Sequence, residues 1–242
     1  MDNTFNIHSI ESFATLEGEG IRFALFLLGC PYRCLYCHNP DTWYGGGKGK
    51  TITTDAIINE MSRYTGFYRN GGGLTATGGE PLLQADKLLP LFKRVKLDLG
   101  LTNTIDTSCA VMPDCIDELL EYTDLMIIDL KFHNNEDYHK YANGSLDNTI
   151  NMLEKTRDKN VRVWVRTVVV TDLNDTIEDM DKYIEIVKRY PHIEKYELLA
   201  YHTMGVYKYH ELGLKYRLEG VEPLPMQKFN MLQSYVKEKL NK

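Results

Sequence analysis

The sequence predicts an α/β fold, an open partial (β/α)6 barrel with parallel strands, on the basis of three observations. Apolar runs rich in β-forming residues alternate with amphipathic stretches along most of the 242 residues. This alternation predicts a parallel sheet built from right-handed βαβ units. About six units are visible, which is short of the eight that close a complete barrel. Polar residues follow the carboxyl ends of the strands, where folds of this class hold their sites.

Each expected element is bounded by its own local signals. Strands are expected at residues 22–28, 74–77, 103–106, 125–130, 161–170 and 195–199, where short apolar runs occur. Helices are expected between and after them, at residues 54–64, 85–96, 115–122, 146–159 and 176–190. Thr54 and Asp55 suit a helix start, as do Asn174 and Asp175, and Pro191 ends the last of these helices.

The chain is long enough for one large domain with a buried core. We therefore expect a single domain over residues 1–242, with the barrel core at about residues 20–200. The tail, residues 203–242, is expected to carry one more helix at about 226–240 and to pack outside the barrel.

Composition argues against several kinds of partner and location. The net charge is −6, and no stripe of Lys and Arg marks a nucleic-acid surface. No apolar run approaches the roughly 18 residues of a membrane span. Residues 1–4 lack the character of a signal peptide, and the five cysteines do not resemble a secreted disulfide framework. We therefore expect a cytoplasmic protein without nucleic-acid or membrane partners.

Three of the cysteines, Cys30, Cys34 and Cys37, fall within eight residues with the spacing C-x-x-x-C-x-x-C. Three thiolates can hold three irons of a [4Fe–4S] cluster and leave the fourth iron open. An open metal position implies chemistry rather than a structural role. The alternative is a structural zinc site, for which His38 would have to bend back as the fourth ligand.

Other polar residues recur where the predicted strands end, and we expect them at the same end of the barrel as the cysteines. They are Gly78, Gly79 and Glu80 after the second strand, Asp106 and Thr107 at the third, Asp129, Leu130 and Lys131 at the fourth, Arg166 late in the fifth and His202 after the sixth. Taken alone, Gly-Gly-Glu would be a turn, Asp129 and Lys131 a surface pair, and Arg166 the partner of a neighbouring acid. Their common position favours a functional site.

Two stretches carry a resemblance to a known family. The cysteine triplet, Tyr36 before its last cysteine and the motif Gly78-Gly79-Glu80-Pro81 resemble the radical S-adenosylmethionine (SAM) enzymes. Within that superfamily, residues 29–43 are similar to the activating enzymes of glycyl-radical enzymes. The likeness extends from Ile7 to about Tyr216, and it also implies the partial (β/α)6 barrel.

The resemblance implies an anaerobic oxidoreductase that uses a [4Fe–4S] cluster and SAM. Cys30, Cys34 and Cys37 would hold the cluster, and the open iron would chelate the amino and carboxylate groups of SAM. Reductive cleavage of SAM would yield a 5′-deoxyadenosyl radical, which abstracts hydrogen from a glycine in a loop of pyruvate formate-lyase. An electron donor such as flavodoxin or ferredoxin is the other protein partner that the resemblance implies.

The family pattern also implies which residues contact the cofactors. The SAM-binding set would be Tyr36, Cys37, His38, Gly79, Asp129, Leu130, Lys131 and His202. The Gly79 carbonyl would accept the methionine amino group and Tyr36 would lie against adenine, whereas a structural hydrogen bond is an alternative role for His38. Oxygen ligands beside the SAM carboxylate would suit a monovalent or divalent cation. Its ligands would be Asp106, Thr107 and Asp129.

The chain departs from the family pattern in places. Residues 17–20 read Glu-Gly-Glu-Gly where relatives usually carry Asp-Gly-Pro-Gly, in a segment expected to face the glycine loop. Cys109 is a stray thiol near the expected site, and Cys115 fits a helix core. No extra cysteine-rich segment lies between residues 37 and 74, which favours the pyruvate formate-lyase type of activator. The alternatives are an activator of another glycyl-radical enzyme, a radical SAM enzyme acting on a small molecule, and a non-enzymatic zinc or electron-carrier module.

Overall fold

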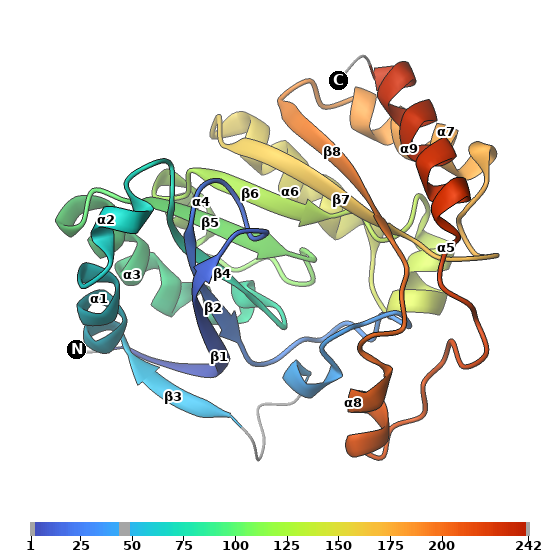
Figure 1. The fold of residues 1–242 in the computed structure, drawn as a ribbon. Helices are drawn as coiled ribbons and strands as arrows, with labels where there is room; N and C mark the ends of the chain where they lie inside the picture. The colour runs from blue at the N-terminus through green and yellow to red at the C-terminus, as the bar shows by residue number, and fades with distance from the viewer. Residues whose placement is uncertain (1–2, 44–48, 241–242) are drawn as a thin grey trace.

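Figure 1 shows the computed structural model, which describes residues 3–43 and 49–240. The described strands form one sheet in the order β3-β1-β2-β4-β5-β6-β7-β8. Their bounds are β1 Thr4–Ala14, β2 Arg22–Leu27, β3 Lys50–Thr53, β4 Gly73–Gly78, β5 Thr102–Thr107, β6 Leu125–Asp129, β7 Arg162–Val169 and β8 Ile193–Ala200. The strands β2, β4, β5, β6, β7 and β8 pair in parallel, and β3 and β8 lie at opposite ends of the order. The predicted open, partial barrel is therefore confirmed.

Two antiparallel strands differ from the expectation. β1 pairs antiparallel with both β2 and β3. Buried Phe5 and Ile7 alternate with exposed residues at the start of β1, but the register to β2 shifts after Ile7. A strand that is regular over only half its length lacks the continuous apolar run that marks the buried parallel strands.

The longer helices cover the outer face of the sheet (Figure 1). Those that match the expected helices are α1 Thr54–Ser62, α3 Ala85–Asp98, α4 Ile116–Glu121, α6 Leu146–Asp158, α7 Ile177–Lys188 and α9 Met226–Leu240. In α3, Leu88, Leu91 and Phe92 are fully buried, because their spacing keeps one face of the helix on the sheet. Thr176 forms a capping box with Asp179, so α7 begins directly after Thr176.

The shorter elements are too brief to show a helical repeat in the sequence. They are η1 Pro40–Thr42, α2 Thr65–Tyr68, η2 Pro81–Gln84, α5 Asn135–Asp137, the π-helical turn η3 Tyr138–Ala142 and α8 Val206–Glu211. In the tail, α9 packs against α7 and β8, whereas α8 packs against η1 beside the cysteines. The two helices of the tail therefore pack on different parts of the fold. Within the described ranges, no helix is both long and apolar enough to cross a membrane.

A buried arginine lies at the amino-terminal end of the parallel strands. Arg22 is 1% exposed and donates from Nε to Thr75 Oγ1 at 2.9 Å. Its other nitrogens donate to Thr102 Oγ1 at 2.6 Å and Thr104 Oγ1 at 2.9 Å. Burial lowers the pKa of Arg22 to about 10, so it remains charged at neutral pH. Because a buried guanidinium needs acceptors for its N–H groups, the inward positions of β4 and β5 are polar rather than aliphatic.

Candidate active site

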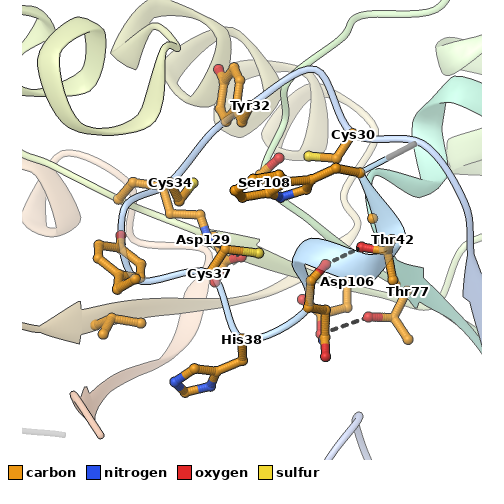
Figure 2. Close-up of a pocket in the computed structure, with 17 residues that line it drawn as sticks. Cys30, Tyr32, Cys34, Cys37, His38, Thr42, Thr77, Asp106, Ser108 and Asp129 are labelled. Carbon is orange, nitrogen blue, oxygen red and sulfur yellow. Dashed lines mark hydrogen bonds and ion pairs between the residues drawn. The ribbon is translucent and has the colours of Figure 1, made fainter. Parts of the chain in front are cut away.

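The three clustered cysteines lie on the loop between β2 and η1. They line one hollow together with residues from the ends of β4, β5 and β6, as Figure 2 shows. Backbone hydrogen bonds join the two ends of this loop and hold its middle. Gly29 N donates to Thr42 O at 2.8 Å, and Leu35 N donates to Tyr141 O, in the turn η3, at 2.9 Å. The shape of the loop is thus set by the chain around it and does not depend on a metal alone.

The thiols of this loop suit an iron–sulfur cluster. Burial raises the pKa of both Cys30 and Cys34 to about 12 and also raises the pKa of Cys37. They therefore keep their protons at neutral pH until a metal displaces them. No three His, Cys, Asp or Glu side chains in the described ranges converge on one point, as the ligands of a single ion would. A cubane cluster does not require such convergence, because each thiolate binds a different iron.

The loop after β4 packs directly on the cysteine loop. Gly79 N donates to Leu27 O at 2.9 Å, and Glu80 N donates to Gly29 O at 2.7 Å. A Cβ atom at position 79 would lie 2.2 Å from the Gly29 carbonyl oxygen. Only glycine fits this close approach of two backbones. The Gly-Gly-Glu motif is therefore more than a surface turn, because it fixes the start of the cysteine loop.

Glu80 has a role that the sequence analysis did not assign. Its carboxylate is fully buried and accepts hydrogen bonds from Thr107 Oγ1 and Ser108 Oγ, each at 2.6 Å. The backbone N–H groups of Ser108 (3.1 Å), Leu82 (3.1 Å) and Ala110 (3.3 Å) donate to it as well. The side chain thus ties the segment after β5 to the segment after β4. In the sequence, only the place of Glu80 in the Gly-Gly-Glu motif pointed to such a role. The structure adds that the side chain is buried, and a buried glutamate needs several hydrogen-bond donors.

Asp129 and Lys131 lie on the same side of the end of β6, as expected from their spacing. Lys131 Nζ is 2.6 Å from Asp129 Oδ2, and both residues line the hollow. Asp106, at the end of β5, also lines it and accepts a hydrogen bond from Thr77 Oγ1 at 3.3 Å. Burial, together with the charge of Asp129, raises the pKa of Asp106 to about 7. Two carboxylates and one ammonium group therefore line the same hollow as the cysteines.

Arg166, on β7, has acidic neighbours on the adjacent strand β8 and on β5, which lies beyond β6 in the sheet. Its Nε lies 3.2 Å from Glu197 Oε2 on β8, and its Nη1 lies 3.7 Å from Asp106 Oδ2 on β5. Its Nη2 donates to the backbone oxygen of Leu16, in the segment between β1 and β2, at 2.8 Å. The structure thus shows Arg166 paired with neighbouring acids.

An aromatic side chain on the cysteine loop has an unused polar group. Tyr36 is 4% exposed and lines the hollow. Its hydroxyl has no hydrogen-bond partner among the residues that the structure describes, and Lys131 Nζ lies 5.9 Å from the centre of its ring. A buried hydroxyl without a partner is costly. The pocket therefore fits a polar ligand that reaches this oxygen.

The two expected histidines are stacked on each other. The ring centres of His38 and His202 are 4.0 Å apart, with 30° between the ring planes. His38 Nε2 donates to His202 O at 3.2 Å, so the alternative structural hydrogen bond is present. His38 lines the hollow, whereas His202 does not line it and is stacked on His38.

Three other residues of the sequence analysis lie behind the lining. Leu130 is fully buried, and the Thr107 hydroxyl donates to Glu80. Cys109 is completely buried in the core, with φ of 57°, and does not line the hollow. Thr107 Oγ1 also accepts a hydrogen bond from Cys109 N at 2.9 Å. Cys115 is partly buried and directly precedes α4, packed against the same core.

The helix α8 holds the cysteine loop from the carboxyl-terminal side. Tyr209 Oη donates to the carbonyl oxygen of Cys37 at 3.0 Å. Lys208 Nζ donates to Asn39 Oδ1 at 2.9 Å and lies 3.0 Å from Asp41 Oδ2. These contacts join residues that are 167 to 172 positions apart, and no local pattern in the sequence signals them.

The parallel partial barrel with three thiols at its carboxyl-terminal edge defines a class of enzyme, and comparison with known proteins agrees with it. Residues 25–185 match the family model described as the radical SAM superfamily, and the chain belongs to that superfamily. Enzymes of this class take a [4Fe–4S] cluster and SAM, and the thiols and polar groups of the hollow fit both.

Curated relatives narrow the class to the family of pyruvate formate-lyase-activating enzymes. The chain is 40% identical over 225 residues to the protein of that name from Staphylococcus epidermidis, covering 90% of this chain and 89% of the relative. It is 39% identical over 236 residues to the one from Clostridium pasteurianum, covering 97% and 98%.

Solved structures share the fold at low sequence identity. SuiB from Streptococcus suis, solved with SAM bound, has a TM-score of 0.65 at 13% identity, covering 88% of this chain and 45% of that one. A domain of a pyruvate-formate lyase-activating enzyme from Bacteroides vulgatus has a TM-score of 0.57 at 19% identity, covering 70% and 95%. These two structures support the architecture alone.

Proposed function

We propose that this chain activates pyruvate formate-lyase by generating a glycyl radical on it. The observation that carries the proposal is the convergence of four features in one hollow. These are the three thiols of the loop after β2, the Gly-Gly-Glu turn, the Asp129–Lys131 pair and the unpartnered hydroxyl of Tyr36. The names of the relatives, at about 40% identity over most of the chain, supply the identity of the partner.

Each feature has a task in this reaction. Cys30, Cys34 and Cys37 hold the cluster. When bound, the cluster supplies the electron that cleaves SAM reductively to methionine and a 5′-deoxyadenosyl radical. The protein orients the sulfonium and limits the access of water and oxygen, which the burial of Cys34, Leu35 and Tyr36 supports.

The side chains around the hollow recognise the ends of SAM. The Gly79 carbonyl accepts the methionine amino group, and Asp129 and Lys131 bind the amino and carboxylate groups. Tyr36 and His38 face adenine, with His202 stacked behind His38 and the Leu130 backbone completing the wall. A cation between Asp106 and Asp129, with Thr107 nearby, would favour the charged form of Asp106, whose pKa is raised by burial and by the charge of Asp129.

The open barrel suits a protein substrate. The strand order ends at β3 and β8 without closing, so a peptide can approach the strand ends from the side. A glycine is a sensible target, because the flanking amide groups stabilise a radical on its Cα. Such a reaction belongs in the cytoplasm under anaerobic conditions.

The test combines cluster assembly with radical detection. Reconstituted enzyme, dithionite, SAM and pyruvate formate-lyase, mixed without oxygen, should give a glycyl-radical signal by electron paramagnetic resonance. Cys34→Ala should abolish SAM cleavage, whereas Cys115→Ala, outside the site, should retain it. Stoichiometric zinc in place of iron would contradict the cluster. SAM cleavage without a glycyl radical on pyruvate formate-lyase would redirect the assignment, either to another glycyl-radical enzyme or to a small-molecule substrate.

A further inference from the structure

A second hollow lies on the outer side of the cysteine loop. Its lining consists of Arg33, Cys34, Leu35, Trp43, Tyr209, Leu214, Lys215 and Arg217. Cys34 and Trp43 also line the candidate active site, so the cysteine loop separates the two hollows and contributes residues to both. Whatever occupies the outer hollow therefore sits directly behind a proposed cluster ligand.

The outer hollow is basic although the chain is acidic. Arg33, Lys215 and Arg217 contribute three cationic groups, and the described lining includes no carboxylate. Lys140 lies beside them, since its carbonyl oxygen accepts a hydrogen bond from Arg217 Nη2 at 2.7 Å. The whole chain carries a net charge of −6, so positive charge is concentrated here against the overall sign. Leu35 and Leu214 supply an apolar floor.

Two of the basic groups, those of Arg33 and Arg217, contact the cysteine loop itself. The Arg33 guanidinium lies 4.9 Å from the centre of the Trp43 ring and donates to Tyr32 O at 2.7 Å. Arg217 Nη1 donates to Arg33 O at 3.3 Å. Arg33 and Arg217 thus lie against the backbone that carries Cys34.

We propose that this outer surface docks a small one-electron carrier protein with an acidic face. The inference rests on the proposed function, because reductive cleavage of SAM needs one electron per turnover. The carrier is oxidised by one electron and the cluster is reduced by one, and no covalent bond forms or breaks. SAM and the substrate loop would occupy the hollow of the candidate active site. The outer surface of the cysteine loop, at Cys34, is then the side that the carrier can reach. Interfaces between electron-transfer proteins are small, and complementary charge guides their association. A compact basic patch suits both properties.

The test uses reduced flavodoxin as the acidic probe. It also uses a variant, called the rim variant, in which the charges of Lys140 and Lys215 at the rim of the outer hollow are reversed. Lys140 and Lys215 are exposed and serve no role in holding the loop, so the double variant Lys140→Glu/Lys215→Glu should fold normally. The matched control is Lys188→Glu/Lys237→Glu on α7 and α9, which changes the net charge equally on a distant surface. The dissociation constant for flavodoxin should rise about tenfold in the rim variant at low ionic strength. It should change less than about twofold in the control, and the difference should shrink as salt screens the charges.

Dithionite, a small reductant that needs no docking surface, separates the possible outcomes. With dithionite, the rim variant should cleave SAM and form the glycyl radical at the wild-type rate. With flavodoxin, the rim variant should carry out both reactions more slowly than the wild type. Equal flavodoxin affinity in the rim variant and the control would overturn the docking inference. If the rim variant formed no glycyl radical with dithionite as the reductant, the docking inference would also be overturned, because the surface would then bind the protein substrate. Failure of wild-type enzyme to cleave SAM with dithionite would instead count against the proposed function.

Discussion

Replacing Glu80 by glutamine should destabilise the site without changing its shape. Oε1 of Glu80 accepts hydrogen bonds from Thr107 Oγ1 and Leu82 N, and Oε2 accepts three, from Ser108 Oγ, Ser108 N and Ala110 N. Glutamine keeps one acceptor oxygen and turns the other into an NH2 donor. At least one backbone N–H must then face a donor instead of an acceptor.

The cost follows from the best orientation of the new amide. Its oxygen satisfies most donors if it faces Ser108 and Ala110, which leaves the Leu82 N–H unpaired at a cost of about 1–3 kcal/mol. The remaining bonds lose their charge assistance, worth roughly 1 kcal/mol more. Relief from burying a charge offsets part of this sum. We expect Glu80→Gln to lower the free energy of unfolding by about 2–3 kcal/mol and the midpoint temperature by about 4–12 °C.

The assay is urea and thermal unfolding followed by circular dichroism, under reducing, oxygen-free conditions. Glu118→Gln on α4 is the matched control, because Glu118 is 54% exposed and pairs with Lys93 at the surface. That change should leave the transition where it is in the wild-type protein. A Glu80→Gln variant within about 0.5 kcal/mol of wild type would refute the reasoning, because it would mean that the buried acceptor is not needed.

Three further substitutions test the wall of the site. Gly79→Ala should lower iron bound per chain after anaerobic reconstitution, because its Cβ would lie 2.2 Å from the Gly29 carbonyl oxygen and displace the cysteine loop. Lys131→Met should weaken SAM binding tenfold to a hundredfold by calorimetry with iron content unchanged, because a charge-assisted hydrogen bond is worth about 1.5–3 kcal/mol. Tyr209→Phe should lower the free energy of unfolding by about 1 kcal/mol, measured in urea, because it removes the 3.0 Å bond to Cys37 O.

Each of these substitutions has a matched control in the chain. Gly66→Ala adds a Cβ that meets no atom within 4 Å, Lys188→Met changes an exposed lysine of α7, and Tyr207→Phe changes a tyrosine that is 58% exposed. Normal iron content in Gly79→Ala would show that the two loops can move apart. Unchanged SAM affinity in Lys131→Met would remove that residue from the site, and equal stability of Tyr209→Phe and Tyr207→Phe would show that α8 does not hold the loop.

Local patterns in the sequence determined the class of fold and the position of the chemistry. The six parallel strands and the longer helices follow from hydrophobic periodicity, which depends on neighbours a few residues apart. The three cysteines lie on one short loop whatever the rest of the chain does. The parallel arrangement then brings Gly79, Asp106, Asp129 and Lys131 to the same edge, because parallel strands all end on one side.

Tertiary structure alone decided which groups meet across that edge. The sequence did not indicate which acid Arg166 would meet, and the structure places it beside Glu197 on β8 and Asp106 on β5. Glu80 became the junction of two loops only because β4 and β5 are adjacent.

The contact of α8 with the cysteine loop was equally hidden, as Tyr209 and Cys37 are 172 positions apart. Such pairings depend on the three-dimensional path of the chain. A side chain's own type and spacing limit what it can bind, but the partner it finds is set by which distant segment packs against it.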